Sequence, residues 1–116
     1  MSTPHAADGQ PLDLGTVGDE LLEQARAQSN GHASRLVVGG SVQRAVLMAL
    51  TSGSQLSDHE SPPAATFQVV RGSARLRGAD GFQLVVGQGQ VVSIPPHRHG
   101  VDALDDCVIL LTVALG

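Results

Sequence analysis

The stretch TFQVVRGSARLRGADGFQLVVGQGQVVSIPPHRHG, residues 66–100, decides the fold. It holds short runs rich in valine and leucine, and turns that contain glycine separate these runs at steady intervals. Short apolar runs bounded by turn residues are typical of strands. With the last apolar run, CVILLTVAL at residues 107–115, the rhythm predicts an all-β sandwich or barrel.

A single helix is predicted before the strands, over about residues 16–29. Val17, Leu21 and Ala25 recur at four-residue spacing and form one apolar stripe. Thr16, followed three residues later by an aspartate, resembles a capping arrangement. The polar residues 1–11 predict a flexible tail.

The barrel is predicted over about residues 34–116. The runs RLVV and SVQRAVLMAL flank Gly39 and Gly40, which predicts two strands joined by a tight turn. The following TSGSQLSDHESPPAA, residues 51–65, is polar and contains two prolines, so we expect a long connection there. At 116 residues, the chain predicts a single domain over residues 12–116.

Composition argues against several classes of partner. The net charge is −4, so we expect no nucleic-acid partner, because phosphate binding needs a concentrated basic surface. No apolar run is long enough to span a bilayer, so no membrane partner is expected. Cys107 is the only cysteine, which fits a reducing compartment and predicts a cytoplasmic protein.

Three of the five histidines are candidate metal ligands. His59 lies in the connection that precedes TFQVV, and His97 and His99 follow the VVSIP run. If the two loops meet at one barrel mouth, the three imidazoles converge, and neutral imidazoles suit Zn, Fe, Ni, Cu or Mn ions. The alternative is that all three are polar loop residues that bond to backbone carbonyls or to water.

The order of these residues resembles the two consecutive motifs of the cupin superfamily. In the first motif Gly53, His59 and Gly72 match, and in the second motif the matching residues are Gly89, Pro95 and His99. The resemblance covers roughly residues 53–115. It implies a double-stranded β-helix (cupin/jelly-roll) barrel with one N-terminal α-helix, and a homodimer.

The resemblance also implies a divalent metal ion (Zn, Fe, Mn, Ni or Cu) at His59 and His99. His97 is a third candidate ligand, because residues two apart in an extended chain project to the same side. Two of the usual ligand positions depart from the family pattern, because Ser61 stands where a second histidine is usual and Ala65 where a glutamate is usual. His97 lies in the turn before the second motif's histidine.

Three functions stay open at this point. The first is a small cupin barrel that binds a divalent metal ion without proven catalysis. The second is a metal-dependent enzyme that acts on a small molecule, such as a dioxygenase or an isomerase. The third is a metal-free sensor or binding module for a small-molecule ligand. The sequence names no substrate.

Overall fold

The computed structural model describes residues 9–95 and 97–115. Most of the predicted tail, residues 1–8, lies outside this part. Helix α1 spans Leu14–Arg26, a few residues before the predicted range at both ends. Its N-cap is Asp13, whose carboxylate accepts hydrogen bonds from the amides of Gly15 and Thr16 at 2.9 and 3.2 Å. The predicted cap, Thr16, therefore lies inside the helix.

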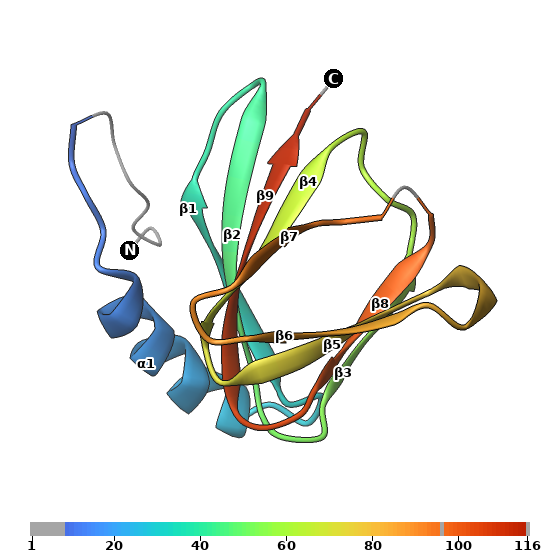
Figure 1. The fold of residues 1–116 in the computed structure, drawn as a ribbon. Coiled ribbons are helices and arrows are strands. Elements are labelled where there is room, and N and C mark those ends of the chain that lie inside the picture. Colours follow the sequence, from blue (N-terminus) through green and yellow to red (C-terminus); the bar gives the residue numbers. More distant parts are fainter. Residues whose placement is uncertain (1–8, 96, 116) are drawn as a thin grey trace.

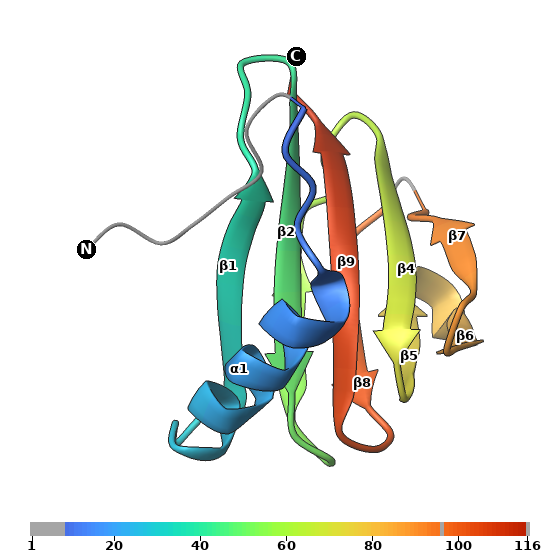
Figure 2. The same cartoon turned by 90° about the vertical axis from the view of Figure 1, so that its left-hand side faces the viewer.

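Within the described residues, nine strands follow the helix and form two antiparallel sheets. Their bounds are β1 (His32–Val38), β2 (Gln43–Leu50), β3 (Gln55–His59), β4 (Ala65–Arg71), β5 (Ser73–Gly78), β6 (Gln83–Gly87), β7 (Val91–Ser93), β8 (His99–Ala103) and β9 (Cys107–Ala114), with a 3-10 turn, η1 (Ala79–Gly81), between β5 and β6. One sheet has the order β1-β2-β9-β4-β7 and the other the order β3-β8-β5-β6. The sheets face each other as the two walls of a barrel, and α1 lies across the outer face of the five-stranded sheet (Figures 1 and 2).

Side chains alternate between the barrel interior and the outside. Inside, Phe67, Leu76 and Ile109 are fully buried and belong to one core that both sheets contribute to. Outside, Leu21 and Leu47 belong to a second core between α1 and the five-stranded sheet. The predicted stripe of the helix is confirmed, because its apolar residues are the ones that this second core buries.

Two segments differ from the expected arrangement. The predicted long connection contains β3, a strand whose residues are mostly exposed. The predicted loop around the last histidines contains the start of β8, so His99 is a strand residue and all five residues of that strand are buried. The hairpin β1–β2 is confirmed.

The barrel is open along one flank. In the sheets formed by the described residues, β1 and β3 are both edge strands, and they do not pair with each other. On the other flank, a short turn at Gly87–Gln90 joins β6 to β7.

Dimerisation stays a prediction. Among the residues described, no helix is long and apolar enough to cross a membrane.

Candidate metal-binding site

Strands β3 and β8 bring His59 and His99 side by side. The two residues are cross-strand partners, and an irregularity of register between Leu56 and His59 sets this pairing. Their ring centroids are 4.5 Å apart and the ring planes are inclined by 64°. Two histidines forty positions apart in the sequence therefore form one imidazole pair.

Backbone carbonyls hold both rings through the same nitrogen. Nδ1 of His99 lies 3.1 Å from the carbonyl oxygen of His97, and Nδ1 of His59 lies 3.2 Å from that of Ser57. A carbonyl oxygen only accepts hydrogen bonds, so Nδ1 carries the proton in each neutral ring and Nε2 keeps a lone pair. This is the arrangement in which imidazole binds metal ions.

Burial favours the form of His99 that binds a metal. The residue is only 2% exposed. Loss of hydration lowers the pKa of its imidazole, and the nearby rings of His59 and His97 add to this effect, although the hydrogen bond to the His97 carbonyl opposes it. His99 is therefore neutral at physiological pH.

The spacing of the pair fits a shared ion. Two imidazoles that bind one ion at about 2.0–2.1 Å, with an N–metal–N angle of about 90–110°, have ring centres roughly 4.5–5.2 Å apart. The observed centroid separation of 4.5 Å falls at the lower end of this range. The donor set of two neutral nitrogens suits a borderline divalent ion.

The third predicted ligand, His97, does not join the pair. Its ring packs edge-to-face on Phe82, with centroids 5.6 Å apart, beside the tip of the β5–β6 hairpin. Within residues 9–95 and 97–115, no group of three or more His, Cys, Asp or Glu side chains is placed to hold a metal ion. The expected convergence is thus found for two histidines and not for three.

An outer layer of charged side chains ties β3 to β8 and β5. Arg98 donates to the Asp58 carbonyl oxygen at 3.0 Å and to Glu60 at 3.1 Å, so it contacts both neighbours of His59 in the sequence. Arg77 donates to the Asp58 carboxylate at 2.8 Å and to the Leu56 carbonyl oxygen at 3.1 Å. These contacts determine how the β3 segment lies against the strand that carries His99.

Asp102 is a member of this layer that the sequence did not indicate. It follows the histidines in the sequence and is only 7% exposed. Its carboxylate accepts hydrogen bonds from Arg75 at 3.1 Å and from Arg77 at 2.8 Å. The alternation of Arg75 and Arg77 along β5 was the available signal, because both face the same side as Asp102 on β8.

A cavity of about 500 Å³ lies at the open flank, and His59 lines it. Its lining combines apolar side chains with polar ones: His32, Met48, Gln55, Leu56, Ser57, His59 and Leu111. No Asp, Glu or Arg of the described ranges is among them. His32 follows the helix in the sequence, a position typical of surface residues. In the structure it is half-buried and lines the same cavity as His59.

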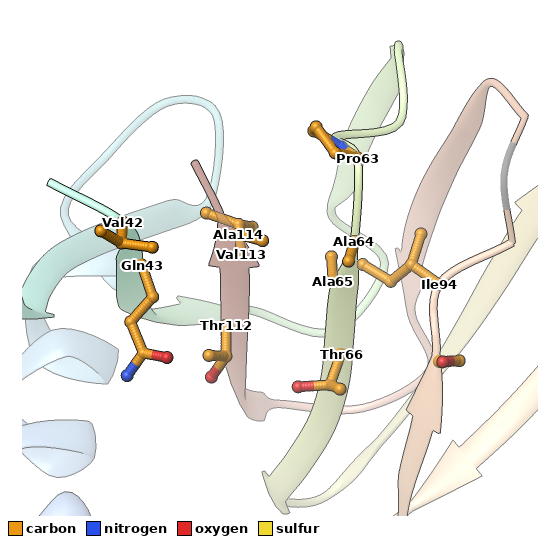
Figure 3. Close-up of a pocket in the computed structure, with 11 residues that line it drawn as sticks. Val42, Gln43, Pro63, Ala64, Ala65, Thr66, Ile94, Thr112, Val113 and Ala114 are labelled. Atoms are coloured by element: carbon orange, nitrogen blue, oxygen red, sulfur yellow. The ribbon is translucent and has the colours of Figure 1, made fainter. Parts of the chain in front are cut away.

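A second groove, of about 490 Å³, lies at the far end of the five-stranded sheet. Gln43, Thr66 and Thr112 line it together with small apolar residues such as Ala65 and Val113 (Figure 3). None of the candidate histidines borders it.

Comparison with known proteins identifies the fold. No family model matches the chain, and no curated protein sequence matches it. Among solved structures, it is similar to a conserved protein of unknown function from Streptococcus pyogenes, with a TM-score of 0.72 and 21% identity over 97% of this chain and 92% of that one. A cupin superfamily protein from Desulfitobacterium hafniense matches with a TM-score of 0.69 and 16% identity, over 77% and 82% of the two chains.

An enzyme is also among the similar structures. The DMSP lyase DddQ from Ruegeria pomeroyi matches with a TM-score of 0.62 and 18% identity, over 73% of this chain and 47% of the lyase. These comparisons and the strand topology describe a small antiparallel β-barrel domain with a histidine pair on two neighbouring strands of one sheet. Its fold is that of the cupin superfamily, as the sequence motifs predicted.

Proposed function

We propose that this cupin domain binds a divalent metal ion through Nε2 of His59 and Nε2 of His99. The observation that carries the proposal is the geometry of the pair: the rings lie 4.5 Å apart, and backbone carbonyls occupy both Nδ1 atoms. Two lone pairs on a largely apolar, partly enclosed surface are the chemistry that an imidazole-binding ion needs.

The remaining coordination positions fall to water or to a small molecule. Ala65 has no donor atom, and the hydroxyl of Ser61 donates to the carbonyl oxygen of Pro62 at 3.1 Å. The two positions that depart from the cupin motif therefore contribute no strong ligand. A bound ion would polarise an oxygen donor of a ligand that reaches it.

The cavity beside His59 supports a small-molecule ligand. Its volume of about 500 Å³ lies in the range of small-molecule sites. Because Met48, Leu56 and Leu111 line it and no Asp, Glu or Arg of the described residues does, it favours an uncharged, largely apolar molecule. The likeness to DMSP lyases carries no reaction to this chain, because 18–19% identity speaks for the fold alone.

The test is a metal titration of untagged protein with Zn²⁺, Ni²⁺ and Cu²⁺ by calorimetry, together with elemental analysis of the protein as purified. We expect the wild type to bind an ion and the double variant His59→Ala/His99→Ala to lose it. His32→Ala is the matched control, because it removes a histidine that lines the same cavity but lies outside the pair. It should bind like the wild type.

Equal metal binding by the double variant would contradict the proposal. A specific observation then favours the metal-free binding module: two neutral imidazoles in edge-to-face contact at 4.5 Å are also a stable packing arrangement. In that case the cavity would bind apolar ligands in the presence of a chelator.

A further inference from the structure

The ring of His97 occupies a seat on the β5–β6 hairpin. It lies over Gly78, where a Cβ atom would be 2.2 Å from its Cε1 and 2.9 Å from its Nδ1. Phe82 contacts the same ring edge-to-face. Gly78 has a φ of −144°, which any residue adopts, so the glycine is needed for the space that His97 fills rather than for its backbone.

The backbone around the seat also holds Nδ1 of His97. This atom lies 3.4 Å from the amide nitrogen of Ala79 and 3.1 Å from the carbonyl oxygen of Arg98. If Nδ1 carries no proton, it accepts a hydrogen bond from the Ala79 amide. If Nδ1 carries the proton, it donates a hydrogen bond to the Arg98 carbonyl. Either tautomer fixes the ring, and neither turns Nδ1 toward an ion.

The main chain of His97 contacts the imidazole pair directly. Its carbonyl oxygen accepts the hydrogen bond from Nδ1 of His99 at 3.1 Å. The ring of His97 and the ring of His99 are thus two residues apart on one segment, the first anchored on the hairpin and the second directed into the barrel. A shift of the His97 ring would move the carbonyl that orients His99.

From these contacts we infer that His97 is a positioning residue: the seat formed by Gly78 and Phe82 anchors its ring, and its carbonyl thereby holds His99 with Nε2 unprotonated. The inference rests on the proposed function only for the role of the oriented His99 ring, which is to bind a metal ion. The orientation of His99 is a property of the metal-free protein and is measured separately.

The experiment compares substitutions that empty, block or preserve the seat in the full chain. Gly78→Ala places a methyl group where the ring lies. His97→Phe keeps a ring in the seat but has no nitrogen to bind a metal, whereas His97→Ala removes the ring. Gly87→Ala is the matched control at the other end of the same hairpin, where a Cβ meets only the flexible Gln90 side chain at 3.4 Å.

Two readouts are used, both without activity. The first is the tautomer of His99, from long-range ¹H–¹⁵N NMR of the ring nitrogens in chelator-treated protein. The second is the affinity for Zn²⁺. We expect the wild type, Gly87→Ala and His97→Phe to keep the tautomer protonated at Nδ1, and Gly78→Ala and His97→Ala to show a mixture of tautomers. Zn²⁺ affinity should fall about tenfold in the last two, as is typical when a group that orients a ligand is removed.

Two results would overturn the inference. One is a His99 tautomer in both Gly78→Ala and His97→Ala that matches Gly87→Ala. The other is loss of Zn²⁺ binding in His97→Phe with the wild-type tautomer retained, which would make His97 a ligand. If Gly78→Ala does not fold, the His99 tautomers and Zn²⁺ affinities of His97→Phe and His97→Ala are sufficient to test the positioning role. If even the wild type binds no Zn²⁺, the proposed function fails, while the tautomers still test the positioning role.

Discussion

Gly100 lies where β3, β5 and β8 press together, and its substitution by alanine tests the layer that aligns the histidine pair. A Cβ there would be 2.5 Å from the Asp58 carboxylate, 2.6 Å from Arg77 Nη2 and 2.9 Å from the Leu56 carbonyl oxygen. The two side-chain ends can move aside, but the Leu56 carbonyl belongs to the β3 backbone. The alanine therefore pushes β3 away from β8.

The size of the effect follows from the interactions that the added methyl group disturbs. Overpacking of this kind costs about 1–3 kcal/mol. The hydrogen bond from Arg77 to the Leu56 carbonyl contributes about 0.5–1.5 kcal/mol, and the partly exposed pair Arg77–Asp58 less than about 1 kcal/mol. We expect Gly100→Ala to lower the free energy of unfolding by about 2–4 kcal/mol.

The assay is urea unfolding followed by far-UV circular dichroism, because the chain has no Trp or Tyr to report by fluorescence. The midpoint should fall by roughly 1–2 M urea. Gly87→Ala is again the control, with a midpoint equal to or slightly above that of the wild type. Equal midpoints for the two alanine variants would refute the argument that Gly100 sets the approach of β3. Because His59 lies on β3, Zn²⁺ affinity should fall in Gly100→Ala as well.

Two further predictions concern single buried groups. Because burial lowers the pKa of His99 below its unfolded value of about 6.5, the unfolded chain takes up a proton first, so the free energy of unfolding should decrease as pH falls below about 6.5 and level off below the folded pKa. Urea midpoints between pH 8 and 5 in the presence of a chelator measure this, and His99→Gln should flatten the dependence; an equal slope in the variant would contradict it. Burial, with smaller contributions from Asp105 and Asp106, raises the pKa of the Cys107 thiol to about 12, so the native protein should not react with Ellman's reagent at pH 8, whereas the unfolded protein should react at once. Rapid reaction of the native protein would show that Cys107 is accessible.

The strands that the sequence predicted are those with strong apolar alternation. Residues 65–94 form β4 to β7 as expected, because turn glycines bound runs of valine and leucine there. Strand β3 was missed because it is a mostly exposed edge strand, and Leu56 is its only apolar residue. The helix start was misplaced because Asp13 and Thr16 are both good N-cap residues, and only the folded backbone decides between them.

The histidine pair was predictable only in part. The motif spacing singles out His59 and His99, and the structure places their rings together. His97 lies outside the motif match and was a candidate only because alternate residues of an extended chain project to the same side. That reasoning failed since His97 precedes the first residue of β8, and the space over Gly78 takes its ring instead. No sequence pattern shows such a space.

The identity of the donors narrows the metal that the pair would select. Manganese and iron sites in proteins draw on carboxylate oxygens, and here Ala65 stands at the position where the cupin motif has its glutamate. Asp58, beside His59 in the sequence, is bonded to Arg77 on the outer face. With two neutral nitrogens and no carboxylate, affinity follows ligand softness and the Irving–Williams order, which favours Cu²⁺ over Ni²⁺ and Zn²⁺ and leaves Mn²⁺ weakest. Of the five ions that the motif resemblance implied, manganese and iron are thus the least suited to the residues that this chain provides.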